Sequence, residues 1–197
     1  MSTDHELALV DYAQSILASG GVVLVTGPIR SARTALLRRL ANDPARAEAI
    51  VNIITVDDTT SPEALSALCG LRSGVLAIDG LDATDPIPAL MTNDDGTAIL
   101  ATCHALDAVG ALDRLVSAAL AQGLSERAAA RLVHTHVDLV LVTGRRPPQA
   151  TTTTAGTQFM ITAASAIHDS EPVPVYVTGL HGGRLTLPTT DHRGGRR

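Results

Sequence analysis

The stretch that decides the fold is G-V-V-L-V-T-G-P-I-R-S-A-R-T, residues 21–34. Its apolar run at 22–25 is typical of a buried strand, and Gly27 allows a sharp exit from that strand. A helical pattern of leucines follows over residues 36–40. Backbone N–H groups at the start of a helix bind anions, because the unsatisfied donors and the helix dipole both favour negative charge. The stretch therefore predicts a strand, a phosphate-binding loop and a helix.

The P-loop pattern, G-x-x-x-x-G-K-[ST], fits this stretch at Gly27 and Thr34. Ala32 stands where the last glycine belongs, and Arg33 stands where the lysine belongs. The chain contains no lysine, so all 15 basic residues are arginine. Thr34 would offer its hydroxyl to Mg²⁺. The alternative interpretation is an ordinary strand–turn–helix connection with a Gly-Pro turn, and both remain open at this point.

Composition favours one compact soluble domain. The 197 residues are enough for one well-filled core, and 45% of them are hydrophobic although only 2% are aromatic. No apolar run approaches the roughly 20 residues of a membrane span. The N-terminus lacks a signal-peptide pattern, and the two cysteines are too few for a disulfide framework, so we expect a cytoplasmic protein. A net charge of −5 argues against broad nucleic-acid binding.

Predicted strands and helices alternate along the chain. We expect strands at 22–26, 50–56, 74–78, 99–102 and 137–143, and helices at 5–18, 34–41, 62–70 and 107–121, with another starting at Ser125. Such alternation predicts a mostly parallel sheet flanked by helices. A Pro/Thr-rich linker at 147–156 follows the core of residues 1–146. Two strand regions, 157–167 and 173–187, predict a short C-terminal β extension within 157–190, and 191–197 reads as a disordered basic tail.

Four segments in order resemble the ATPases of type II and type IV secretion, conjugation and pilus assembly. GPIRSART (27–34) resembles their Walker A loop, and TVDDT (55–59) their acidic box. LRSGVLAIDGLDA (71–83) resembles their Walker B segment, and GTAILATCHALDAVGALDRL (96–115) their His box with the helix after it. The likeness covers roughly residues 15–146. It implies a RecA-like P-loop NTPase fold, of which this chain is a divergent and truncated example.

The resemblance implies a set of site residues. ATP would be bound by Gly27, Ser31, Ala32, Arg33, Thr34 and Ala35, and Mg²⁺ by Thr34 and Asp79. Catalytic roles fall on Asp57, Asp79 and His104. For Asp57 the alternative is a cap of the following turn, and for His104 a structural role. His134 and His136 read as ordinary polar residues, because no further metal-ligating residues accompany them.

The departures from the family pattern fall on the residues that carry its chemistry. Arg33 keeps a positive charge, but its planar guanidinium is larger than the ammonium that the loop is shaped to hold. The same register puts Gly80 on the catalytic glutamate, so the water-activating carboxylate is absent unless Asp79 or Asp82 replaces it. Losing one preorganised catalytic group typically costs about 10²–10³ in rate. Whether the chain is still an ATPase is therefore an open question.

The resemblance and the departures from it leave two possible functions. The first is an ATP-binding subunit of a secretion, pilus or conjugation apparatus, with weak or no hydrolysis. The second is a pseudo-ATPase that acts as a structural or regulatory interaction module without nucleotide. The family resemblance implies partners in such machinery and either a homo-oligomer, a hexamer in the family, or a mixed assembly with an active ATPase. It implies no specific nucleic acid, and a place at the inner face of the membrane only through partners.

Overall fold

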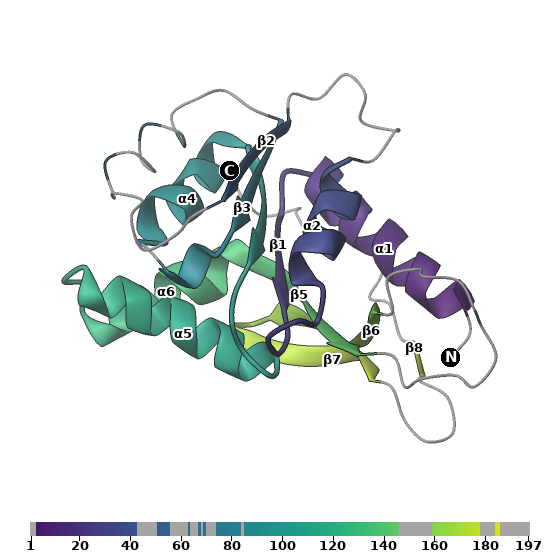
Figure 1. Ribbon diagram of the computed structural model, residues 1–197. Coiled ribbons are helices and arrows are strands. Elements are labelled where there is room, and N and C mark those ends of the chain that lie inside the picture. Colours follow the sequence, from purple (N-terminus) through teal and green to yellow (C-terminus); the bar gives the residue numbers. More distant parts are fainter. Residues whose placement is uncertain are drawn as a thin grey trace.

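The computed structural model describes residues 3–42, 51–55, 63, 67, 69, 74–83, 85–145, 159–177 and 184–185. Within them a central sheet has helices on both faces (Figure 1). Its strands are β1 (Val22–Thr26), β2 (Val51–Thr55), β3 (Val75–Asp79), β4 (Ala98–Thr102), β5 (Val137–Arg145), β6 (Phe159–His168), β7 (Glu171–Val177) and β8 (Arg184–Leu185). The helices are α1 (Thr3–Ala18), α2 (Arg33–Ala41), α4 (Ile87–Thr92), α5 (Ala108–Ala121) and α6 (Glu126–His136). The expected α/β fold is confirmed.

The sheet of the described residues has the order β2-β3-β4-β1-β5-β6-β7-β8. Its first five strands are mutually parallel, with β1 between β4 and β5. The last three are antiparallel and continue the sheet beyond β5. In an open parallel sheet, ligands sit beyond the carboxyl ends of the strands, and the loop after β1 lies at that edge.

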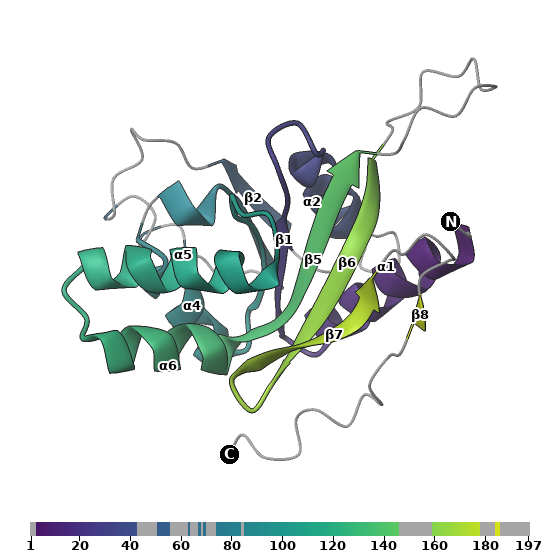
Figure 2. The same ribbon diagram turned by 90° about the horizontal axis from the view of Figure 1, so that it is seen from below.

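Two apolar cores lie on opposite faces of the sheet, because successive side chains of a strand point to opposite sides. Val23 and Val25 of β1 pack on the side of α1 and α2, whereas Val22 and Leu24 pack on the side of α4, α5 and α6. Figure 2 shows the two groups of helices on either side of the sheet. All five residues of β1 are buried, so the strand that leads into the loop is a rigid central element.

Local sequence signals explain where α5 and α6 begin. Ser125 accepts a hydrogen bond from the N–H of Ala128 and caps α6, as its position predicted. Asp107 caps α5 in the same way, through the N–H of Gly110. The short helix α4, which begins after Pro86, was not predicted. Six residues are too few to display a helical period, so Asp85 and Pro86 at its start are the local signals that the sequence offers.

Some predicted regions lie outside the described residues. These are the acidic segment with Asp57, most of the expected helix at 62–70, the linker at 147–156 and the tail at 191–197. No helix in the described part of the chain has both the length and the apolar character that a membrane crossing requires.

Candidate functional site

The loop after β1 turns at Gly27, where only glycine fits. Its φ angle is +148°, in a region that other residues rarely adopt. A Cβ at this position would lie 2.4 Å from the carbonyl oxygen of Thr143 and 2.6 Å from Oγ of Ser31. The backbone therefore passes directly against β5 before it leads into the loop.

A chain of hydroxyl groups holds the loop against the sheet. Thr143 of β5 donates from Oγ1 to the carbonyl oxygen of Thr26 at 2.9 Å. Since that bond uses its single proton, the 2.8 Å contact between Oγ of Ser31 and Oγ1 of Thr143 must be donated by Ser31. The N–H of Ser31 also donates within the loop, to Pro28 at 3.1 Å. Ser31, expected among the ligand-binding residues, thus uses both its donors to shape the loop.

The loop ends in a left-handed residue that starts α2. Ala32 has φ +61° and ψ +32°, and Arg30 also has a positive φ, +64°. Glycine normally occupies such positions, because a Cβ there costs about 1–2 kcal/mol. No side chain caps α2 at Ala32, so its first amides, those of Arg33, Thr34 and Ala35, face the loop mouth as donors for an anion.

Thr34 and Asp79 meet at the start of α2. Thr34 Oγ1 donates to Asp79 Oδ2 at 2.8 Å, which joins the loop to the carboxyl end of β3. Thr102, at the end of β4, donates to the other oxygen of the carboxylate, Oδ1, at 2.6 Å. The same Thr102 hydroxyl accepts the N–H of Gly80 at 2.8 Å. The carboxylate is therefore held in one orientation between two threonine hydroxyls.

Arg33 does not point along the loop. Its Nη1 donates to the carbonyl oxygen of Cys103 at 2.9 Å, and its Nη2 contacts Nε2 of His104. Because arginine can only donate, Nε2 of His104 must be the acceptor, and the imidazole is neutral. Partial burial, and then the nearby Arg33 charge, lower the pKa of His104. Burial also lowers the pKa of Arg33, although the Asp82 and Asp79 carboxylates oppose that shift.

Asp82 and Arg114 form an ion pair beside this contact. Oδ2 of Asp82 accepts from Nη1 of Arg114 at 3.1 Å and from the N–H of His104 at 3.0 Å. The Asp82 side chain is only 7% exposed, whereas that of Arg114 is 53% exposed. Burial, and then the Asp82 charge, raise the pKa of the neighbouring Cys103 thiol to about 12, so Cys103 is no nucleophile at neutral pH.

Gly80 occupies the turn immediately after β3, with φ +96°. It supplies no side chain where the resemblance expects a carboxylate. Asp57 lies outside the described residues, so its catalytic role stays a prediction. The strand before it, β2, ends at Thr55, which is paired with Asp79 across the sheet. The carboxyl end of β2 therefore lies at the same edge of the sheet as the loop.

An open cleft separates the loop from the segment after β4. It is lined by Gly27, Pro28 and Ile29 on one side, and by residues 104–107, Gly110 and Arg114 on the other. Of the described lining residues, Arg114 alone carries a permanent positive charge. His104 also lines the cleft, so its contact with Arg33 lies at the edge of the cleft.

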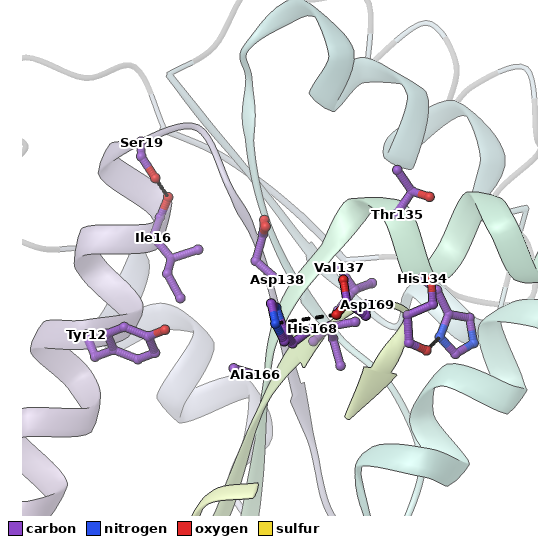
Figure 3. A pocket seen from close by; sticks show the side chains of 12 residues that line it. Tyr12, Ile16, Ser19, His134, Thr135, Val137, Asp138, Ala166, His168 and Asp169 are labelled. Carbon is purple, nitrogen blue, oxygen red and sulfur yellow. Dashed lines mark hydrogen bonds and ion pairs between the residues drawn. The ribbon is translucent and has the colours of Figure 1, made fainter. Parts of the chain in front are cut away.

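A second cavity, of about 290 Å³, lies at the opposite end of the strands. Figure 3 shows it between α1, the start of β5 and the turn between β6 and β7. Asp138 there accepts the N–H of Val22, at the amino end of β1, at 2.8 Å. His134 contacts the carbonyl oxygen of Ser170 through Nδ1 and so ties α6 to that turn. Since β1 runs from this cavity to the loop, the two sites are separate.

Three further residues, none of them assigned to the loop site from the sequence, help to build it. Thr102 orients Asp79, Thr143 anchors the loop, and Arg114 faces the cleft from α5. Thr102 and Arg114 both lie within residues 96–115, the segment that resembles the His box and its following helix, so that segment was a usable signal for both. Thr143 acts through contacts with residues 112 and 117 positions away in the sequence, which no local pattern reports.

No protein-family model matches this sequence, and neither does any curated protein sequence. Solved structures do match. The VirB11 ATPase of the Brucella suis type IV secretion system, in complex with sulphate, has a TM-score of 0.57 and 17% identity over 84% of this chain and 56% of that chain. The Legionella pneumophila ATPase DotB has a TM-score of 0.56 and 11% identity over 83% and 51%. The pilus retraction motor PilT with bound ADP has a TM-score of 0.52 and 14% identity over 70% and 46%.

These similarities establish a shared fold. The chain spans about half the length of the solved structures it matches. The order of the parallel strands, the position of the loop after β1 and the fold of these ATPases together confirm the RecA-like P-loop architecture that the sequence predicted.

Proposed function

We propose that this chain is a divergent nucleotide-binding subunit that binds ATP with Mg²⁺ at the loop of residues 27–34 and hydrolyses it weakly or not at all. One observation carries the proposal. The hydroxyl of Thr34 and the carboxylate of Asp79 lie 2.8 Å apart, directly beside the uncapped amides of α2. In P-loop NTPases the loop Ser/Thr and an Asp at the end of a neighbouring strand hold the metal, and the amides cradle the phosphates.

The donor set fits Mg²⁺. This ion prefers oxygen ligands and is usually bound through one or two carboxylates plus phosphates and water. Thr34 and Asp79 supply a hydroxyl and a carboxylate. Within the described residues no group of three or more His, Cys, Asp or Glu side chains is arranged to hold a metal by itself. The ion would therefore bind together with the nucleotide, and its charge would offset that of the phosphates.

Among the described residues, the two carboxylates near the loop, Asp79 and Asp82, do not offer a general base. Thr34 and Thr102 each hold one oxygen of Asp79. Asp82 has one oxygen bonded to Arg114 and His104, and the other is buried with no hydrogen-bond partner among the residues that the structure describes. Gly80 has no side chain to give. Bound ATP gains little acceleration without a group that orients or deprotonates water, and the lack of such a group in the described part of the chain supports weak or absent hydrolysis.

The binding proposal is tested by calorimetry and thermal unfolding with ATP, with and without Mg²⁺. A ligand at 100 times its dissociation constant stabilises by about 2.7 kcal/mol, which for this chain length is a rise in Tm of roughly 5–10 °C. Asp79→Asn should remove the Mg²⁺-dependent part of the binding. Thr34→Ala is compared with a matched control, Thr135→Ala at the opposite end of the sheet. The control variant should leave ATP binding unchanged. Equal binding with and without Mg²⁺ would refute the metal site.

Restoring the loop should strengthen binding. Ala32→Gly with Arg33→Lys recovers the close backbone approach and the compact charge, so the double variant should bind ATP more tightly. Hydrolysis should appear only when Gly80→Glu is added to this double variant. Because residue 80 has φ +96°, which disfavours glutamate, the turn after β3 must shift to accept the new side chain. A wild-type rate of around one turnover per second, lost in Asp79→Asn, would show instead that Asp79 activates water.

The second candidate is a pseudo-ATPase that serves as a structural or regulatory interaction module without nucleotide. The contacts of Arg33 favour it, because this side chain is already bonded to Cys103 and His104 and not directed along the loop. Absence of ATP binding in both the wild type and the loop-restored double variant would select this candidate.

The partners we propose are proteins of a secretion, pilus or conjugation apparatus, at the cytoplasmic face of a membrane. The basis is the shared fold with VirB11, DotB and PilT, which their descriptions assign to such systems or call ATPases or motors. A homo-oligomer, or a mixed assembly with an active ATPase, is the proposed state. Sedimentation of the chain alone and with a candidate ATPase, with and without ATP, distinguishes the two.

A further inference from the structure

Arg114 is the exposed cation of the cleft beside the loop. It projects from α5, which is the opposite side of the cleft from Gly27, Pro28 and Ile29. We propose that Arg114, positioned by Asp82, binds the terminal phosphate of ATP and makes the site prefer ATP over ADP. This inference rests on the proposed function, since it assigns a residue to the same site.

The burial of Asp82 gives the first argument. A carboxylate that is only 7% exposed needs a cation or several donors to offset its lost hydration. The N–H of His104 and one N–H of Arg114 supply these to Oδ2, while Oδ1 is buried and has no hydrogen-bond partner among the described residues. Asp82 is therefore placed to hold Arg114 and not to meet a ligand.

The geometry of Arg114 gives the second argument. A guanidinium carries five N–H donors in a planar fork, and its bond to Asp82 uses one of them. With 53% of its side chain exposed, the group is anchored on one side and open to the cleft on the other. An anchored arginine loses less side-chain freedom on binding an anion than an unanchored one, because its geometry is already fixed.

The position of Arg33 gives the third argument. In P-loop NTPases the lysine at this position reaches the β- and γ-phosphates. Here the Arg33 guanidinium donates to Cys103 and His104, at the end of β4. Among the described residues that line the cleft, the positive charge open to it is therefore that of Arg114 on α5. The α2 amides and the Thr34–Asp79 pair locate the inner phosphates and the metal, so a cation across the cleft is suited to the outermost phosphate.

The test compares ATP with ADP. Calorimetry of the wild type should give tighter binding of ATP than of ADP. Arg114→Ala should weaken ATP by about ten- to a hundredfold, the usual range for a hydrogen bond to a charged group, and change ADP by less than about threefold. Arg114→Lys should retain part of the preference, because the charge remains without the fork. Asp82→Asn should reduce the preference by an intermediate factor. Arg131→Ala, on the exposed face of α6, is the matched control and should change neither affinity.

ADP binding also reports whether each variant is folded, so a loss of ATP binding with ADP binding intact cannot come from unfolding. If wild-type ATP and ADP affinities are equal, or if Arg114→Ala lowers both by the same factor, Arg114 does not read the terminal phosphate and the inference fails while the nucleotide site stands. If the wild type binds neither nucleotide, the proposed function itself fails.

Discussion

Replacing Ala32 by glycine should make the protein more stable, although it removes a methyl group and lies at the start of a helix. Ala32 has φ +61° and ψ +32°, where a Cβ costs about 1–2 kcal/mol. Glycine removes this strain, but its greater freedom in the unfolded chain returns about 0.5–1 kcal/mol. The net gain is about 0.5–1 kcal/mol. A change of 1 kcal/mol moves Tm by about 2–4 °C at this chain length, so we expect a rise of about 1–4 °C.

Calorimetric unfolding without nucleotide measures this change, and Ala35→Gly is its matched control. Ala35 lies inside α2, only three residues further on, where the same substitution should cost about 1 kcal/mol and lower Tm by about 2–4 °C. The two variants share a chemical change and a helix but should move Tm in opposite directions. If Ala32→Gly lowers Tm as Ala35→Gly does, the residue is not left-handed and the loop does not have the shape described above.

Three further predictions concern the same framework. Gly27→Ala should unfold the loop or destabilise the protein severely, since the new Cβ would lie 2.4 Å from a backbone oxygen. Gly96→Ala, at a position with a positive φ but open space around it, should cost only the backbone strain of about 1–2 kcal/mol. Denaturant unfolding of the two variants compares these costs. The pKa of His104 is lowered in the folded state, so at pH values below the usual pKa of about 6.5 the folded protein binds fewer protons than the unfolded chain. The free energy of unfolding should therefore fall as the pH drops below about 6.5, and it should fall less in His104→Gln. NMR titration of the imidazole and thermal unfolding against pH test this, and a pKa above the usual value would contradict the neutral acceptor facing Arg33. Asp138→Ala should lower the free energy of unfolding by about 1–3 kcal/mol, because it leaves the amide of Val22 at the start of β1 buried without an acceptor. Asp138→Asn should be nearly neutral, since its amide oxygen can still accept. Equal Tm values for the two variants would argue against that hydrogen bond.

The sequence predicted the parts of the site that depend on residue type at a strand end. Gly27 follows a run of buried apolar residues, and Asp79 follows another, so the alternation of strands and helices was enough to place both at one edge of the sheet. Thr34 fitted the loop pattern itself, and it contacts Asp79 as a loop and strand end at one edge should. Periodicity and strand-end chemistry were sufficient for these three residues.

The directions of the charged side chains could not be predicted in this way. Arg33 was expected among the ATP-binding residues, and its guanidinium bonds to two residues at the end of β4 that lie 70 and 71 positions away in the sequence. Asp82 was considered as a replacement for the missing glutamate. Its burial and its bond to Arg114 appear only when β3 and α5 are packed together. Both depend on tertiary neighbours that no local pattern encodes.

The strand order also bears on how the chain must fold during synthesis. β1 lies between β4 and β5, and its first residue, Val22, is hydrogen-bonded to Asp138, 116 residues later in the chain. At roughly 5–20 residues per second, the ribosome needs about 6–23 s to make that partner. During this time a fully buried strand of the sheet lacks one of its two neighbours or both, and pairing over such separations is intrinsically slow. We therefore expect nascent chains shorter than about 140 residues to depend on chaperones, and the loop of residues 27–34 to be among the last parts of the molecule to fold.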